Sequence, residues 1–426
     1  DLGAYESNAI VAINKNRPDL VYTNIQAAID AGRNGETIEL VNSRITSEFF
    51  GTHGGVITVD KSLNIVGNGA TLDAEGKSGI IRINDGNNNS VISVGIQNIT
   101  LINGAAALGG AINNAENLLL NNVKLTNNTA TVAGGAIYNN GGNIFINYST
   151  IANNRSNGNG GAINSLKGNV EIYYSTLSHN QSRGNGGAIN VENGSLSVNA
   201  STLSHNLAQG DGGAIAAYNS SLLSDSNTLA YTGAANGGAI YANGGKVTVF
   251  GNTIAFNHVA EFGSGSGLYI GDGTSYSVMR TLAVFNHANG SYGEDVYVTM
   301  RASGIIEDSI YIYLGDETPI GEDVEFFPGA YYLDSDIFTS EFLHDNGGWT
   351  QTLALAVNSL ARDYGDPDNK SEVDEFDQRG YMRDGSYDIG AFEYAGAIGK
   401  VYSDANKSDN GTTIIYISSL EDLNDI

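Results

Sequence analysis

Short apolar segments separated by Gly, Asn and Ser recur along the chain with a nearly constant period. The tetrapeptide Gly-Gly-Ala-Ile begins at positions 109, 134, 160, 186, 212 and 237, in steps of 25, 26, 26, 26 and 25 residues. In the unit that begins at Gly160, three apolar segments centre on Ile163, on Val170 with Ile172, and on Leu177. Alternation of apolar and polar positions is typical of strands with one buried face. The pattern predicts about three short strands per unit.

Such a unit predicts one coil of a parallel β-helix. Coils stack at about 4.8 Å, the spacing of paired strands, so equivalent residues form columns. A helical repeat is the alternative, but helical arrays usually have longer units, and abundant Gly and Asn disfavour helices. The two clearest predicted core columns are Ile112, Ile137, Ile163, Ile189, Ile215 and Ile240, and Leu125, Ile151, Leu177, Leu203, Leu229 and Ile254.

A short segment near the N-terminus follows a different pattern, with three apolar residues on one helical face between two residues suited to capping. We predict a short amphipathic helix that covers the N-terminal end of the solenoid, because an uncovered first coil would expose its core. The apolar residues are Ile25, Ala28 and Ile29, and the caps are Asn24 and Gly32.

Composition limits the functions open to such a solenoid. The chain has 426 residues and a net charge of −26, which argues against binding nucleic acid or an anionic membrane surface. It has no cysteine, which excludes disulfides, thiol chemistry and Cys-ligated zinc. No run of about 18 apolar residues exists, so we predict no direct membrane insertion by this segment.

The repeated GGAI resembles the repeat of polymorphic outer-membrane-protein adhesins, which combine GGA[ILV] with FxxN. We find only the first half of that motif, because "VFGN" and "AFNH" lack the FxxN spacing. The resemblance covers residues 109–240 well and residues 93–300 loosely. It implies a protein that lies outside the cell, at the cell surface.

The C-terminal part carries a second resemblance. The segments "HDNGGWTQTLALAVNSLARDYGD" (344–366) and "FDQRGYMRDGSYDIGAFEY" (376–394) are similar to the end of right-handed β-helix surface proteins of the choice-of-anchor type. Leu360 and Arg362 depart from that family, which more often has Pro and Ile there. The resemblance implies an exported right-handed β-helix that forms part of a longer, anchored chain, and it implies no known activity.

We therefore predict an all-β protein built as a right-handed parallel β-helix with four regions. Residues 1–45 form an N-terminal cap and residues 46–343 form the β-helix. Residues 344–394 form a C-terminal coil and cap, and residues 395–426 are a linker or the start of a following domain.

The residue after each GGAI is predicted to point outward from the sheet. Tyr rings can stack on sugars and Asn amides can bond to hydroxyl groups, so this column is a candidate glycan-binding surface. The alternative is that Tyr is simply a favourable strand residue with a polar tip. The column comprises Asn113, Tyr138, Asn164, Asn190, Tyr241, Tyr269 and Tyr297.

Three further columns have structural interpretations with a functional alternative. Asn128, Asn154, Asn180 and Asn206 precede GGAI by six residues and are predicted to form a hydrogen-bonded ladder at a turn. His179 and His205 lie next to this ladder. They are interpreted as two rings stacked at the turn, with metal binding as the alternative. A threonine column suits strands, or an ice-binding face: Thr150, Thr176, Thr202, Thr228, Thr253 and Thr281.

Calcium is the only cofactor that the sequence suggests. Asp366, Asp368 and Asp377 have the spacing of positions 1, 3 and 12 of a calcium loop, although the loop glycine is missing and Lys370 stands at position 5. Beside them, charges of both signs are predicted to form a buried ion-pair network that closes the last coil. Its members are Asp377, Arg379, Arg383, Asp388 and Glu393.

The preferred functional prediction is a non-enzymatic surface protein, an adhesin or cell-envelope stalk that binds glycans or neighbouring cell-surface proteins. The alternative is a polysaccharide lyase or glycoside hydrolase, which needs clustered carboxylates. Charges within the repeats are sparse and out of register, which disfavours an enzyme. An ice-binding protein is a weaker alternative. The best remaining carboxylates for catalysis are Asp60, Asp73, Glu75 and Asp85.

Overall fold

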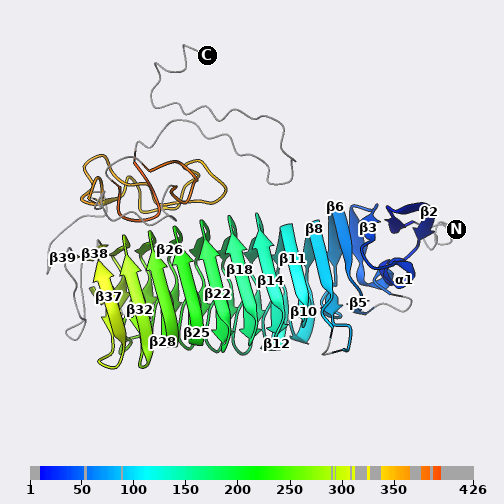
Figure 1. Cartoon of the computed structure of the whole chain (residues 1–426), viewed down its shortest axis with the longest axis horizontal. Coiled ribbons are helices and arrows are strands. Elements are labelled where there is room, and N and C mark those ends of the chain that lie inside the picture. The colour runs from blue at the N-terminus through cyan, green and yellow to red at the C-terminus, as the bar shows by residue number, and fades with distance from the viewer. Residues whose placement is uncertain are drawn as a thin grey trace, which may run out of the picture.

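Successive repeat units coil into a long parallel β-helix, and equivalent strands pair in register from coil to coil (Figure 1). This confirms the predicted all-β parallel solenoid. The computed structural model describes residues 10–51, 55–87, 90–288, 291–292, 294–307, 309–311, 324–326, 337–364, 376–383 and 387–394. The predicted C-terminal linker, residues 395–426, lies outside these residues.

Two columns of strands form the first part of each coil. The first column follows the glycine pair: β5 (Ile57–Val59), β7 (Ile81–Ile83), β10 (Ile112–Asn114), β13 (Ile137–Asn140), β17 (Ile163–Leu166), β21 (Ile189–Glu192), β31 (Leu268–Ile270) and β36 (Val296–Val298). The second contains β3 (Thr37–Leu40), β14 (Asn143–Asn147), β18 (Asn169–Tyr173), β22 (Ser195–Asn199), β32 (Thr274–Met279) and β37 (Ser303–Glu307). Both columns share β25 (Ile215–Asp225) and β28 (Ile240–Phe250).

The rest of each coil contains two more columns. The third contains β4 (Arg44–Thr46), β15 (Thr150–Ala152), β19 (Thr176–Ser178), β23 (Thr202–Ser204), β26 (Thr228–Ala230), β29 (Thr253–Ala255), β33 (Leu282–Val284), β38 (Ser309–Tyr311) and β39 (Val324–Phe326). The second and third columns share β6 (Leu63–Asp73), β8 (Ser93–Ile102) and β11 (Asn117–Thr126).

A short fourth column separates the asparagine turn from the next glycine pair, so a regular coil has one strand more than the predicted three. It contains β9 (Ala105–Leu108), β12 (Thr129–Ala133), β16 (Arg155–Ser156), β20 (Gln181–Ser182), β24 (Leu207–Ala208), β27 (Gly233–Ala234), β30 (His258–Val259) and β34 (His287–Ala288), with β35 (Ser291–Tyr292) paired antiparallel to β34.

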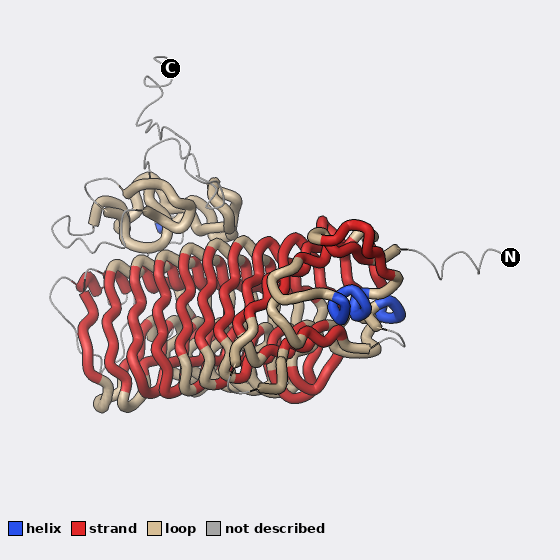
Figure 2. The backbone as a smooth tube through the Cα atoms, turned by 45° about the vertical axis from the view of Figure 1, so that its right-hand side comes forward, coloured by secondary structure: helices blue, strands red, loops and turns tan. Residues whose placement is uncertain are grey.

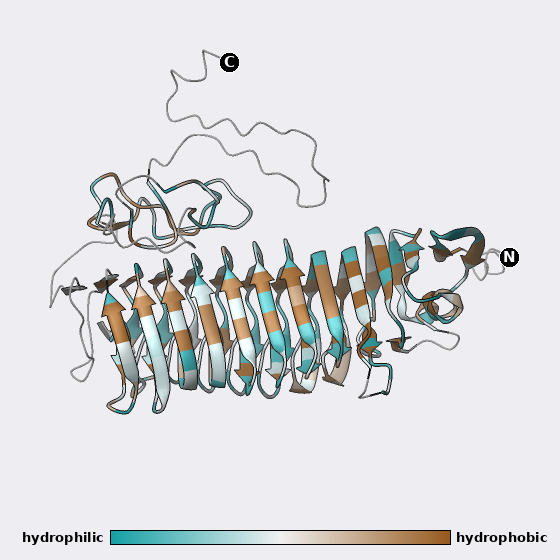
Figure 3. Ribbon diagram, viewed as in Figure 1, coloured by the Kyte–Doolittle hydropathy of each residue, from teal (hydrophilic) through white to brown (hydrophobic). Residues whose placement is uncertain are grey.

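The two predicted apolar columns lie in the interior of the solenoid, together with the inward residues of the second column of strands. Ile137 pairs with Ile163 and Ile151 pairs with Leu177, and all four side chains are buried. Complete burial of such a side chain stabilises the fold by about 1.5–3 kcal/mol. The bands of hydrophobic and hydrophilic residues along the strands show the alternation that directs these side chains inward (Figure 3).

The N-terminal end carries an antiparallel pair and one short helix (Figure 2). β1 (Ala12–Asn14) pairs with β2 (Arg17–Tyr22), and α1 (Ile25–Ala31) follows. The Asn24 side chain accepts a hydrogen bond from the Ala27 N–H at 2.8 Å, and the buried face of α1 joins the apolar core of the coils. A short 3₁₀ helix (Ser47–Phe49) precedes the first regular coils.

The segment that we expected to form a C-terminal coil and cap lies instead along the side of the β-helix (Figure 1). Gln378 Nε2 donates to Thr202 Oγ1 at 2.9 Å, and the Ala391 N–H donates to Thr253 Oγ1 at 3.0 Å. Apolar residues on β26, β29 and β33 pack with Ile337, Phe338 and Ile389 in one buried cluster. We call the described residues 337–364, 376–383 and 387–394 the lateral segment.

The lateral segment also changes the interpretation of the threonine column. Thr202, Thr228 and Thr253 are buried beneath it. An ice-binding face requires exposed threonines, so this part of the column cannot serve as one. Among the described residues, no helix is long and apolar enough to cross a membrane.

Candidate functional site

The residues after GGAI form one continuous column, but its middle does not reach solvent. The column runs in register through Asn113, Tyr138, Asn164, Asn190, Ala216, Tyr241, Tyr269 and Tyr297. Asn164, Asn190 and Tyr241 are buried, contrary to the expected exposed surface. Asn190 Nδ2 donates to Asn164 Oδ1 at 2.9 Å and to Glu192 Oε1 at 3.0 Å. Asn159 Nδ2, in the turn before the glycine pair, donates to the same Glu192 oxygen at 3.2 Å, so this turn contacts the middle of the column.

The tyrosines at the C-terminal end of this column stack on one another. The ring centroids of Tyr241 and Tyr269 are 4.7 Å apart, and those of Tyr269 and Tyr297 are 5.1 Å apart. Burial, with the neighbouring phenols, raises the pKa of Tyr269 to about 12. The column therefore has the geometry of a packed aromatic stack, with its rings turned toward each other.

The asparagines before GGAI form a buried ladder. Asn154 Nδ2 donates to Asn180 Oδ1 at 3.0 Å, and Asn180 Nδ2 donates to Asn206 Oδ1 at 3.1 Å. Each amide also bonds to backbone: Asn180 Nδ2 donates to the Ile151 carbonyl, and its Oδ1 accepts from the Asn154 N–H. Asn128 begins the same series. These side chains satisfy the backbone groups of the turn.

The two histidines beside the ladder belong to an aromatic stack. His179 and His205 lie parallel at 4.7 Å, and His205 stacks on Tyr231 at 5.0 Å. Tyr231 in turn stacks on Phe256. No group of three His, Cys, Asp or Glu suited to a metal occurs in the described part of the chain.

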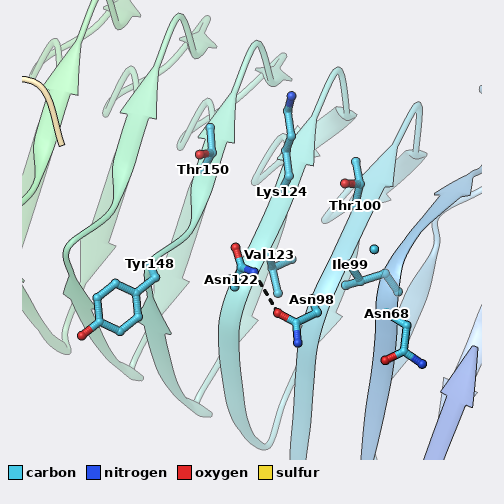
Figure 4. A pocket seen from close by; sticks show the side chains of 10 residues that line it. Asn68, Asn98, Ile99, Thr100, Asn122, Val123, Lys124, Tyr148 and Thr150 are labelled. Atoms are coloured by element: carbon cyan, nitrogen blue, oxygen red, sulfur yellow. Dashed lines mark hydrogen bonds between the residues drawn. The ribbon is translucent and has the colours of Figure 1, made fainter. Parts of the chain in front are cut away.

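An open hollow lies where the second column of strands turns into the third (Figure 4). Its volume is about 480 Å³. Asn68, Asn98 and Asn122 stand at the corner with φ near +52°, a conformation that Asn tolerates better than most residues. Asn122 Nδ2 donates to Asn98 Oδ1 at 2.8 Å. The remaining polar side chains of the hollow are Thr100, Lys124, Tyr148 and Thr150.

One aromatic side chain, Tyr148, lines this hollow, and two further aromatic rings pack against it. Tyr148 occupies the same corner position as Asn122, and its ring stacks on Tyr174 at 5.3 Å with an interplanar angle of 6°. The ring of Trp349 lies 4.6 Å from that of Tyr148 and is 51% exposed. We call Tyr148, Tyr174 and Trp349 the aromatic corner. Sequence reasoning missed it, because residues 148 and 349 meet only through the lateral segment.

The carboxylates considered for catalysis are already engaged. Asp73 is buried, which by itself raises its pKa, but hydrogen bonds from Asn103, the Glu75 N–H and Arg44 lower the pKa overall. Lys77 and Ser47 lower the pKa of Glu75. Asp73 and Glu75 line a hollow of about 480 Å³, yet neither has the raised pKa that a general acid requires.

The other two candidate carboxylates lie elsewhere on the early coils. Asp60 is paired with Lys61 at 3.6 Å. Asp85 accepts hydrogen bonds from Ser90 Oγ and from the Asn87 N–H, and both lower its pKa. Neither lines the hollow beside Asp73.

One predicted ligand of the calcium loop, Asp377, has other partners in the structure. Asp366 and Asp368 lie outside the described residues. Asp377 is buried and forms an ion pair with Arg379 at 2.6 Å. Its two oxygens also accept from the backbone N–H groups of Arg379, Tyr381 and Glu393. Asp377 therefore stabilises the lateral segment.

The charged residues beside Asp377 form the expected network, but within the lateral segment and not at the last coil. Arg383 Nη1 donates to Glu393 Oε2 at 3.1 Å, and both side chains are buried. The Arg379 guanidinium lies 3.7 Å from the centroid of the Phe392 ring. Asp388 accepts from the N–H groups of Asp363 and Tyr394.

We expect the docking of the lateral segment to weaken as pH rises through 6. Burial, with the Asp363 charge, raises the pKa of Asp388 to about 6, whereas the unfolded value is near 3.8. The folded form therefore holds a proton that the unfolded form has lost, and stability declines as pH rises from about 4 through 6. Hydrogen-exchange protection of residues 387–394, corrected for intrinsic rates, should fall about tenfold or more. Protection that does not change with pH in the wild type would contradict this prediction. The same would follow if Asp388→Asn kept the pH dependence of the wild type.

Comparison with known families gives a match within the repeats. Residues 122–140 match the Chlamydia polymorphic membrane protein repeat. No curated protein matches the chain. The match includes the glycine pair at 134 and also Leu125 to Asn128, which keep the FxxN spacing with Leu in place of Phe. The sequence interpretation missed this half of the motif because it required Phe. A repeat of this kind in a parallel β-helix fits a surface-associated, adhesin-like protein.

Proposed function

We propose that the chain is a non-enzymatic adhesin, exposed at the cell surface, that binds glycans at the aromatic corner. The observation that carries this proposal is the cluster of Trp349, Tyr148 and Tyr174 beside a hollow lined by amides and hydroxyls. Aromatic faces provide apolar contact area, and a few placed polar groups orient a ligand. Among the described residues that line the hollow, Lys124 is the only charged side chain.

The same proposal sets the expected partners. A net charge of −26 disfavours nucleic acid and anionic membranes, whereas glycans and neighbouring cell-surface proteins remain suitable. An enzyme that acts on polysaccharides is the alternative, favoured by the hollow beside Asp73 and Glu75. The lowered pKa of both carboxyls gives preference to binding without turnover.

Binding of the full chain to an array of neutral and acidic glycans tests the proposal. We expect Trp349→Ala and Tyr148→Asn to weaken binding of the selected glycan about tenfold, because each removes an aromatic contact. Asn suits position 148, because Asn122 holds the equivalent corner. Phe262→Ala is the matched control, since this ring is 94% exposed and lies outside the hollow.

Three results would reject this proposal. The first is the absence of glycan binding, and the second is an equal loss of binding in the Phe262 control. The third is release of new reducing or unsaturated ends from a bound polysaccharide, lost in Asp73→Asn, which would favour the enzyme. Retained circular dichroism in each variant shows that a loss of binding is not a loss of fold.

A further inference from the structure

A second hollow lies on the outer face of the second column of strands, away from the aromatic corner. It has a volume of about 530 Å³ and spans β6, β8, β11, β14 and β18. None of its lining residues belongs to the hollow at the corner. It therefore offers a separate surface that crosses several coils.

One side of this hollow is a rail of exposed amides. Asn143 Nδ2 donates to Asn117 Oδ1 at 3.0 Å, and Asn169 Nδ2 donates to Asn143 Oδ1 at 2.9 Å. Ser195 Oγ donates to Asn169 Oδ1 at 2.7 Å and extends the series. An amide nitrogen has two hydrogens and an amide oxygen has two lone pairs, so each group can make a further bond to a ligand. We call Asn117, Asn143 and Asn169 the amide rail.

The floor beside the rail is apolar. Leu119 is 43% exposed and Phe145 is 36% exposed, and the two are partners in neighbouring strands. Residues two apart in a strand share a face, so the floor and the rail face the same way. The equivalent residue of β8 is Gly95, and the side chain of Asn64 lies over it, with Oδ1 2.4 Å from the position that a Cβ would take. Tyr173 contacts Phe145, with ring centroids 5.3 Å apart.

The charge of the hollow indicates which ligand fits. Among its described lining residues, Glu171 is the only charged side chain, and it is a carboxylate. An acidic polysaccharide would meet no cation there, whereas a neutral sugar can use the amides and the apolar floor. Consecutive coils present the amides of the rail about 4.8 Å apart along the axis, so a repeating ligand would meet a similar polar contact in successive coils.

We propose that this hollow binds a neutral, linear oligosaccharide that lies along the β-helix axis. The sugar faces pack on Leu119 and Phe145, and the hydroxyls bond to the amide rail. This inference extends the proposed glycan-binding function to a second surface, but it depends on different residues. The two can therefore fail separately.

Titration of the full chain with neutral β-linked gluco-oligosaccharides of two to six units, followed by calorimetry, tests the inference. We expect affinity to rise with length and to fall about tenfold in Phe145→Ser. Serine suits this position because Ser197 holds it two coils further on. Ile305→Ser is the matched control, an exposed apolar residue later in the same column and outside the hollow, and should retain affinity.

Further variants separate the possible outcomes. Asn143→Ala should also weaken binding, whereas Trp349→Ala should leave it unchanged. Loss of oligosaccharide binding in Trp349→Ala, but not in Phe145→Ser or Asn143→Ala, would overturn the inference and support binding at the aromatic corner. If Phe145→Ser weakens oligosaccharide binding but Trp349→Ala affects the binding of no glycan, binding at the aromatic corner is rejected and the inference stands. Preference for an acidic oligosaccharide, absence of binding, or equal effects of Phe145→Ser and Ile305→Ser would overturn it.

Discussion

Gly161→Ala should destabilise the β-helix by about 3 kcal/mol or more, because a Cβ at this position has no space. An added Cβ would lie 2.1 Å from the backbone carbonyl oxygen of Gly187, in the next coil. It would also lie 2.6 Å from the backbone of Gln181. Backbone atoms of stacked coils cannot move without loss of strand pairing. Hydrogen exchange of residues 134–192 and thermal unfolding by circular dichroism measure the effect.

Gly79→Ala is the matched control for this prediction. Gly79 stands in the same column, since Ile81 pairs with Ile112, but its nearest neighbours to an added Cβ are 3.4 Å or more away. That distance is ordinary van der Waals contact. We expect this variant to change stability by less than about 1 kcal/mol. Equal effects of the two substitutions would show that the glycine pair is not required by close coil stacking.

Asn180→Ala should cost about 2–4 kcal/mol, because it leaves buried backbone groups without partners. The Asn154 N–H and the Ile151 carbonyl would each lose the bond that Asn180 makes to them, at 3.0 Å and 2.9 Å. Asn206 Oδ1 would also lose the donor at 3.1 Å. The loss should appear first as faster exchange of the amides of the turn at 151–154.

Asn143→Ala provides the comparison for the buried ladder. Asn143 also belongs to an asparagine series with amide bonds, but it is exposed on the amide rail. Water can replace the bonds that it loses, so we expect a cost of less than about 1 kcal/mol. A similar cost for both substitutions would indicate that burial does not decide the strength of the ladder.

The glycine pair and the ladder explain why so much of the fold could be predicted. Each coil repeats the same close approach and the same turn, so Gly160 with Gly161 and Asn180 recur in sequence with the period of the coil. A Cβ at Gly135, Gly161, Gly187 or Gly213 would collide with the carbonyl oxygen of the equivalent residue one coil on. Because every coil imposes the same steric and hydrogen-bonding requirement, the residues that meet it recur in the sequence.

The exposure of the candidate glycan-binding column could not be predicted from the same periodicity. The periodicity placed Asn164 and Asn190 on the outward side of the strand, and their register agrees. Whether an outward side chain reaches solvent depends on the turn that crosses it, here through Asn159 and Glu192. That contact joins a turn of one coil to the end of β21 in the next coil, and the strand alternation contains no information about it.

By itself, the sequence determined the parallel solenoid, its buried columns and the asparagine ladder, because these rest on contacts between residues one period apart. Only the tertiary structure decided where the lateral segment lies, which threonines it covers and how Trp349 meets Tyr148. Gln378 and Thr202 are 176 residues apart and bond once. Such single contacts depend on the fit of two folded surfaces, and that fit leaves no periodic signal along the chain.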